Sequence, residues 1–150
     1  MTAQPDPQGF LMRGSWRAGA VPSHRLELRG GTDAPTEARR LVVGLLADRV
    51  TASDLADVEV LVSELVTNAV RHGQVGEDDT LVVHLALGED VLRVEVCDSG
   101  PGFSGPAVPR PRPGGGGNGL MLVDRLSTAW GVSGDDGTCV WFERELAPLG

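Results

Sequence analysis

The stretch SELVTNAVRHG, residues 63–73, has the apolar spacing of an amphipathic helix but carries an asparagine in its interior. Asparagine is a poor helix former, because its side chain competes for nearby backbone groups. Asn68 follows Glu64 by four residues, so the two side chains share one face of the helix. A carboxylate beside an amide oxygen can orient water and ligate a hard cation such as Mg2+. The alternative is an ordinary exposed polar pair on the flank of a helix.

The helix that contains this pair is predicted to begin at a cap formed by Ser53 or Asp54. It is expected to continue to about Arg71 and to end at Gly73. Its apolar stripe comprises Val58, Leu61, Val62, Leu65 and Ala69. The Glu–Asn pair lies just off one edge of that stripe, so both side chains are expected to point along a buried surface toward a cleft.

Outside this helix, the pattern changes between strand-like alternation and helical spacing. We expect strands at 24–30, 80–87 and 91–98, a helix at about 37–50 capped by Thr36, a helix over 120–130, and a final hairpin over 130–146 with its turn at 134–137. This order indicates an α+β fold, a two-layer α/β sandwich in which helices cover one face of a mixed, mainly antiparallel sheet. The predicted domain covers residues 23–147, and residues 1–22 are expected to form a flexible leader.

The composition is that of a globular protein with a hydrophobic core: 150 residues, of which 41% are hydrophobic and 23% are charged. The formal net charge of −8 argues against direct binding of nucleic acid. No window of about 18 apolar residues predicts a membrane span, and the N-terminus lacks the apolar core of a signal peptide. We therefore expect a cytoplasmic protein that does not contact the membrane.

The two cysteines, Cys97 and Cys139, both fall in strand-like runs. Two buried, reduced thiols are the usual form in a cytoplasmic chain. No histidine stands at ligand spacing to a cysteine, so a structural zinc site is not expected. His72, Trp130 and Trp141 are interpreted as packed side chains.

All 13 basic residues are arginine. A Walker A loop needs a lysine on the β- and γ-phosphates, and a protein kinase of the eukaryotic type needs a lysine on a strand. The absence of lysine excludes both of these ATP sites. Any nucleotide chemistry in this chain must use another arrangement.

Two glycine-rich motifs accompany the Glu–Asn helix. DSGPG, residues 98–102, closes a predicted strand, and an aspartate there can accept a hydrogen bond from an exocyclic amine such as that of adenine. Its glycines lack a Cβ, so a flat ring can approach the backbone closely. GGGGNGLMLVDRL, residues 114–126, leads into an amphipathic helix whose first N–H groups can bind phosphate. Each motif alone also suits an ordinary turn or linker.

The order and spacing of the three motifs resemble those of the Bergerat-fold ATPases, the superfamily that includes the sensor histidine kinases, over residues 36–144. ELVTNAVRHG (64–73) and GNGLMLVDRL (117–126) look closest to the bacterial anti-sigma factor kinases. The resemblance implies a serine/threonine kinase that uses ATP and Mg2+, phosphorylates an anti-sigma factor antagonist and sequesters a sigma factor. It is also compatible with a homodimer, because relatives commonly dimerise.

The resemblance implies a role for individual residues of the three motifs. Glu64 would be the base that activates the attacking hydroxyl, and Asn68 would coordinate the Mg2+ that bridges the phosphates. Asp98 would hold the adenine amino group. The other implied nucleotide-binding positions are Arg71, Gly100, Gly102, Gly117, Gly119 and Leu120. Residues 103–117 would form the ATP lid.

One position departs from the family pattern: residue 118 is Asn118, where relatives often have arginine. The lost charge would weaken the hold on the γ-phosphate. Two functions therefore stay open, the kinase and a non-catalytic module of the same fold in which ATP locks a partner-binding conformation. A domain with degenerate motifs and no ligand is a third, less favoured alternative. The presence of Glu64 favours the kinase.

Overall fold

The fold is seen in a computed structural model, which describes residues 23–72, 76, 78–98, 118–133 and 139–149. The helices and strands within these ranges are β1 (Ser23–Arg29), α1 (Ala34–Leu46), α2 (Ala52–His72), β2 (Thr80–Leu87), β3 (Val91–Asp98), α3 (Asn118–Leu126), β4 (Ala129–Ser133) and β5 (Cys139–Glu145). None of the described helices is long and apolar enough to cross a membrane. The predicted leader, residues 1–22, lies outside the described residues.

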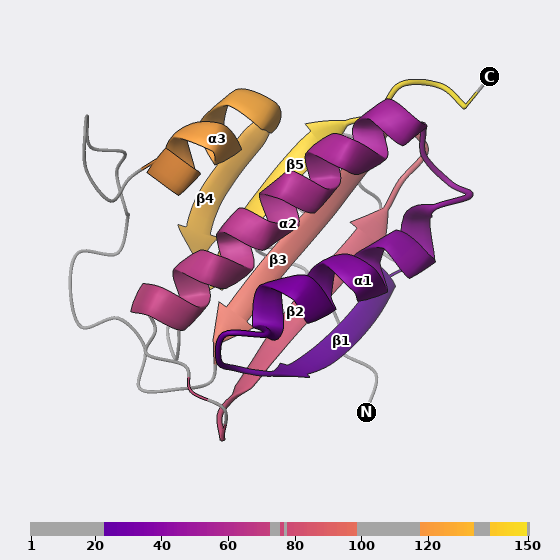
Figure 1. The fold of residues 1–150 in the computed structure, drawn as a ribbon. Coiled ribbons are helices and arrows are strands. Elements are labelled where there is room, and N and C mark those ends of the chain that lie inside the picture. Colours follow the sequence, from indigo (N-terminus) through magenta and orange to yellow (C-terminus); the bar gives the residue numbers. More distant parts are fainter. Residues whose placement is uncertain (1–22, 73–75, 77, 99–117, 134–138, 150) are drawn as a thin grey trace.

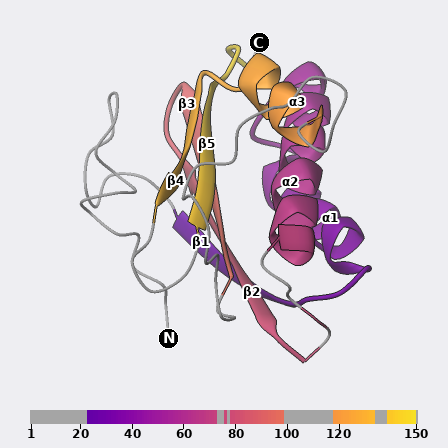
Figure 2. The same cartoon turned by 90° about the vertical axis from the view of Figure 1, so that its left-hand side faces the viewer.

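The five described strands form one open sheet in the order β1-β2-β3-β5-β4, and each of its four pairings is antiparallel. The helices lie together on one face of this sheet, so the molecule has two layers (Figure 1 and Figure 2). This arrangement confirms the predicted α+β sandwich. Because β5 lies between β3 and β4, β3 becomes the central strand.

The apolar core lies between the sheet and the helices. Alternation along β3 directs Leu92, Val94 and Val96 to the face that the helices cover. There they share one buried cluster with Leu61 and Leu65 of α2, and each of the five side chains is at most 1% exposed. Burial of such side chains stabilises the fold by about 1.5–3 kcal/mol each.

The second face of β3 carries charged side chains that are also buried. Arg93 is 0% exposed, forms an ion pair with Glu143 of β5 at 2.8 Å, and lies 4.1 Å from the ring centroid of Trp141. A buried charge needs such partners, because its desolvation is costly when it stands alone. Trp141 is buried as predicted, but on this second face and not among the residues beneath the helices.

The two cysteines form a disulfide, and the prediction of reduced thiols is therefore wrong. Cys97 in β3 is the register partner of Cys139 in β5, with their Cα atoms 4.0 Å apart and an S–S distance of 2.06 Å. The sequence places the two residues 42 positions apart. They meet only because β5 pairs with β3, a pairing that the local pattern of either strand does not reveal.

The first helix has other bounds than predicted. α1 begins at Ala34 and not after Thr36. Pro35 stands in its first turn, where the N–H that proline lacks has no acceptor in the helix. The helix ends at Leu46, somewhat before the predicted position near residue 50.

The last helix is shorter than predicted. α3 ends at Leu126, and Trp130 belongs to β4, because the N–H of Thr128 already donates to the carbonyl of Glu143 in β5 at 2.7 Å. Trp130 is half-buried against the core, as expected of a packed residue. Its Nε1 donates to a carboxylate oxygen of Asp124 at 3.0 Å.

The start of α2 also differs from the prediction. Thr51 caps this helix: its Oγ1 accepts a hydrogen bond from the N–H of Asp54 at 3.1 Å. The prediction of Ser53 or Asp54 as the cap is wrong. The carboxylate of Asp54 instead binds Arg144 of β5.

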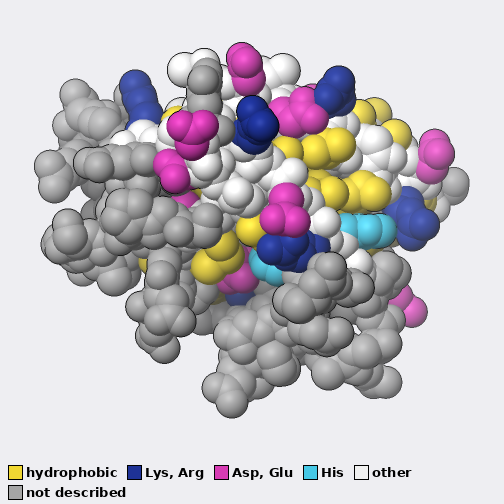
Figure 3. All heavy atoms as spheres, turned by 90° about the horizontal axis from the view of Figure 1, so that it is seen from below, with side chains coloured by type: hydrophobic (Ala, Val, Ile, Leu, Met, Phe, Trp, Pro, Cys, Tyr) yellow, Lys and Arg dark blue, Asp and Glu magenta, His cyan; other side chains and the backbone are white. Residues whose placement is uncertain are grey.

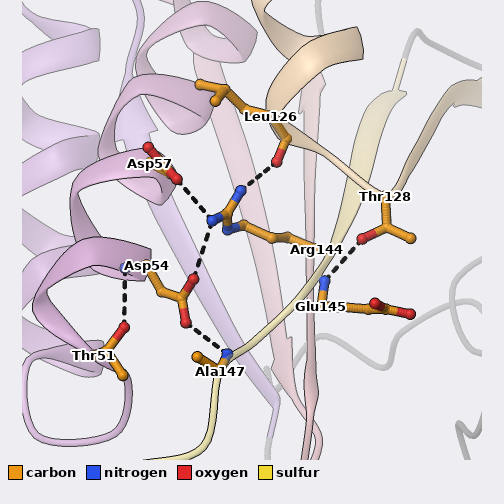
Figure 4. A network of polar contacts seen from close by, with 8 residues as sticks. All are labelled: Thr51, Asp54, Asp57, Leu126, Thr128, Arg144, Glu145 and Ala147. Atoms are coloured by element: carbon orange, nitrogen blue, oxygen red, sulfur yellow. Dashed lines mark hydrogen bonds and ion pairs between the residues drawn. The ribbon is translucent and has the colours of Figure 1, made fainter.

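Arg144 joins three elements in one polar network (Figure 4). Its guanidinium donates to Asp54 at 3.0 Å and to Asp57 at 2.7 Å, both on α2, and to the carbonyl of Leu126 at the end of α3. The N–H of Ala147 donates to the second carboxylate oxygen of Asp54 at 2.8 Å. The network therefore holds the start of α2 and the end of α3 against β5.

The network also sets the protonation of Asp54. Burial acts to raise the pKa of Asp54, but hydrogen bonds from Ala147 and Arg144 and the charge of Arg144 act against it, and the net result is a lowered pKa. A carboxylate with a lowered pKa in the folded state stabilises the fold above its unfolded pKa. This contribution is lost as the pH falls below about 4 and through the lowered folded value.

We predict that Arg144→Leu lowers the free energy of unfolding by about 3 kcal/mol, because it leaves a buried carboxylate without its cation. Urea denaturation at neutral pH measures the change. Arg40→Leu is the matched control: Arg40 pairs with Glu37 on the exposed side of α1, and we expect less than about 1 kcal/mol. Equal losses in the two variants would show that the network does not hold the fold together.

Candidate functional site

The flank of α2 that carries Glu64 and Asn68 faces α3. Asp57 precedes Glu64 by seven residues, about two turns, and lies on the same side of the helix. Its carboxylate binds Arg144, whose guanidinium also binds the last carbonyl of α3. The opposite flank faces α1, because Ser63 accepts a hydrogen bond from an arginine of α1 at 2.8 Å.

The start of α3 lies beside the Glu–Asn pair. α2 and α3 pack together and run in opposite directions (Figure 1), and the end of α3 lies near Asp57. The nine residues of α3 rise about 12 Å, and the same rise along α2 from Asp57 reaches a level between Glu64 and Asn68. The first turn of α3, which includes Gly119 and Leu120, is therefore at that level. A helix leaves the N–H groups of its first turn without internal acceptors, so they can bind an anion.

Asp98 contributes a buried carboxylate at the end of β3. Alternation along the strand places it on the same face as Val94 and Val96, beneath the helices. The residue is only 5% exposed. The end of β3 and the last turns of α2 lie at the same end of the molecule (Figure 1). A carboxylate in this position can accept a hydrogen bond from the amino group of a bound ring.

The side chains on the α3-facing flank differ in exposure. Glu64 and Asn68 are half-buried, and Arg71 at the end of the helix is exposed. Partial burial leaves both polar groups able to touch a ligand. The amide oxygen of Asn68 suits Mg2+, which prefers oxygen ligands and is usually held by one or two protein groups together with phosphate and water. The residues present thus fit the metal that the family resemblance implies.

Glu64 can also be reached from the outer surface of the helix layer. A groove of about 430 Å3 runs there between α1 and α2. Its lining residues are Arg39, Ala56, Glu59, Val60, Ser63 and Glu64. A side chain of a second protein that follows this groove could therefore approach the Glu64 carboxylate.

Part of the predicted site lies outside the described residues. These positions are Gly100, Gly102, Gly117 and the predicted lid at residues 103–117. His72 and Asn118 are the last residue of α2 and the first residue of α3, but their side chains are also outside the description. Of the predicted site residues, the structure describes Glu64, Asn68 and Arg71 on α2, Asp98 at the end of β3, and the backbone of Gly119 and Leu120 at the start of α3.

Comparison with known proteins is consistent with this geometry. Residues 32–144 match the model of a family described as the histidine kinase-like ATPase domain. An anti-sigma F factor of Halalkalibacterium halodurans is 32% identical over 68 residues, which are 43% of this chain and 47% of that protein. A serine-protein kinase RsbW of Listeria monocytogenes is 42% identical over 50 residues, which are 33% of this chain and 32% of that protein. The matched segments thus span less than half the length of these curated relatives.

The family match extends from the residues before α1 almost to the end of β5, and so includes α2, the end of β3 and the start of α3. These are the three elements that carry Glu64, Asn68, Asp98 and Gly119. On the extent of this match, the chain belongs to the histidine kinase-like ATPase domain family.

Proposed function

We propose that this protein binds ATP with Mg2+, transfers the terminal phosphoryl group to a serine or threonine of an anti-sigma factor antagonist, and binds a sigma factor. One observation supports the proposal: α3 begins beside the second half of α2, which carries Glu64 and Asn68, and the end of β3, with the buried Asp98, lies at the same end of the molecule as the last turns of α2 (Figure 1). The names of the similar proteins, an anti-sigma F factor and a serine-protein kinase, support both halves of the proposal.

In this proposal, the nucleotide lies between the end of β3 and the start of α3. Asp98 accepts a hydrogen bond from the adenine amino group. The resemblance implies that Gly100 and Gly102, which lack a Cβ and lie outside the described residues, are beneath the ring. The first N–H groups of α3, at Gly119 and Leu120, bind the phosphates. Asn68 would hold the Mg2+, which would supply the neutralisation of phosphate charge that a lysine provides in other ATP sites.

Glu64 supplies the base. Its carboxylate accepts the proton of the attacking serine or threonine hydroxyl, so that the hydroxyl oxygen forms a bond to the γ-phosphorus while the bond from that phosphorus to the β–γ bridging oxygen breaks. ADP leaves, and the proton stays on Glu64 until solvent takes it. The groove between α1 and α2 gives the substrate side chain a route to this carboxylate. Catalysis here requires positioning and charge neutralisation more than covalent chemistry.

A non-catalytic module is the second candidate, and one observation favours it. α3 begins with Asn118, so its first turn lacks the arginine that relatives often place there. In that case, ATP would bind and lock a conformation that holds a partner, with no transfer. The two functions share the nucleotide site and differ in whether Glu64 is needed.

Proteins are the proposed partners, in the cytoplasm and without direct contact with nucleic acid. The net charge is −8. Seen from below, the described part of the surface carries acidic and basic side chains side by side, with hydrophobic ones between them (Figure 3). The described part of this face thus shows no continuous basic stripe of the kind with which proteins track a phosphate backbone. A homodimer stays a prediction from the resemblance.

Asp98→Asn is expected to weaken Mg-ATP binding by about 10- to 100-fold, because a hydrogen bond to a charged group contributes about 1.5–3 kcal/mol. Isothermal titration calorimetry on the folded variant measures the loss. Asp90→Asn is the matched control, since Asp90 is exposed in the hairpin before the other end of β3. If Asp98→Asn binds Mg-ATP as tightly as Asp90→Asn does, Asp98 does not contact the adenine.

Glu64→Ala is expected to slow phosphorylation of the antagonist at least about 100-fold, because loss of a general base has effects of this order. Mg-ATP binding should change less than about threefold, since Asp98 and α3 supply most of the contacts. Glu59→Ala controls for changes in the groove, because Glu59 of α2 lines the same groove as Glu64. A transfer rate that is unchanged in Glu64→Ala would show that Glu64 is not the base. If transfer is lost in this variant but regulation in cells is unaffected, the kinase function is rejected, and a wild type that binds ATP but transfers nothing would show that the protein is the non-catalytic module.

A further inference from the structure

The disulfide lies directly beside the proposed adenine site. Cys97 precedes Asp98 in β3, and because neighbouring residues of a strand point to opposite faces, the sulfur and the carboxylate lie on opposite sides of one backbone segment. Asp98 points beneath the helices, whereas Cys97 faces the second side of the sheet, where it meets Cys139. Any movement of this segment therefore moves the carboxylate.

Within the described residues, the disulfide is also the last link between β3 and β5 at this end of the sheet. The described register of β3 with β5 runs from Val91 opposite Glu145 to Cys97 opposite Cys139, where it ends. The chain then enters the residues that carry Gly100 and Gly102. The covalent bond thus fixes the strand end that carries Asp98.

We propose that Cys97 and Cys139 are a thiol–disulfide modification site that controls nucleotide affinity, with the oxidised form binding Mg-ATP more tightly. This inference rests on the proposed ATP site and adds its regulation. In the oxidised form, the end of β3 is already fixed when the nucleotide arrives. In the reduced form, binding must also order that end. Fixing the backbone of one further residue corresponds to about tenfold in affinity.

The reductant would be a protein or small-molecule dithiol. Its thiolate attacks one sulfur of the pair and forms a mixed disulfide, and its second thiol then displaces that sulfur. The Cys97–Cys139 bond is thereby reduced to two thiols with two electrons and two protons, and the dithiol becomes a disulfide. Both cysteines are half-buried, so the bond is not sealed inside the core. Disulfides of reducing compartments are mostly of this transient, redox-sensing kind.

The sequence makes the test specific, because the chain has only two cysteines. Any effect of a thiol reductant on the protein must therefore act at this pair. Contaminating metal ions need to be removed as well. The carboxylate of Glu95 lies within 4.8 Å of both sulfurs, and in the reduced protein these three side chains could bind a soft divalent cation. All measurements on reduced protein are accordingly made with metal-free protein, with Mg2+ as the only added metal.

The test is calorimetry of Mg-ATP binding to the oxidised wild type, to the wild type reduced by a phosphine, and to the double variant Cys97→Ser, Cys139→Ser. We expect reduction to weaken binding about tenfold, and we expect the double variant to match the reduced wild type whether or not reductant is present. Hydrogen exchange of the amides of Val96 and Asp98 should accelerate in the same two samples.

Leu46→Ala is the control for a merely stabilising disulfide. Leu46 is 1% exposed at the end of α1, outside the proposed nucleotide site, so its truncation should lower the melting temperature without changing affinity while the cysteines stay linked. Equal Mg-ATP affinity of oxidised and reduced wild type would overturn the redox inference alone. No binding in either state would overturn the proposed ATP site and the inference with it.

Discussion

The central strand β3 is buried on both faces, and its two-residue alternation governs the rest of the structure. One set of side chains enters the apolar core beneath the helices, and the other set forms a buried charged and aromatic layer around Arg93 and Trp141. A shift of one residue in register would exchange the two sets and bury Arg93 in the apolar core. The same alternation presents Asp98 to the helix side and Cys97 to the other side. Packing and proposed chemistry thus depend on a single register.

A second constraint sets the rotation of α2. Arg144 is a charged residue within the sheet, and its guanidinium is satisfied by two aspartates of α2 and the last carbonyl of α3. These contacts turn one side of α2 toward α3, and Glu64 and Asn68 lie on that side further along the helix. The ion-pair network lies at the start of α2, and Glu64 follows Asp57 by about two turns on the same side of the helix. The network that stabilises the fold thus also orients the flank that carries the proposed site.

The elements and the residues of the site follow largely from sequence, whereas their connections do not. The periodicities of 80–87 and 91–98 give the bounds of β2 and β3, and the spacing of Glu64 and Asn68 gives their common flank. The sequence does not predict the cap at Thr51, because aspartate is an equally common capping residue and Asp54 lies close by. In the structure the carboxylate of Asp54 binds Arg144 instead. The position of Arg144 does indicate that it needs a buried partner, since it lies on the same core-facing side of its strand as Val140 and Phe142. The disulfide could not be predicted from the local sequence, because it depends on the pairing of β3 with β5, which are not consecutive strands.

The central claim is that α2, β3 and α3 bind a single nucleotide at their common end. A crystal structure with Mg2+ and a non-hydrolysable ATP analogue tests it most directly. The account predicts the adenine amino group within hydrogen-bond distance of the Asp98 carboxylate, Mg2+ on the amide oxygen of Asn68, and the phosphates at the first turn of α3. Adenine bound elsewhere, or phosphates that do not reach α3, would contradict the account.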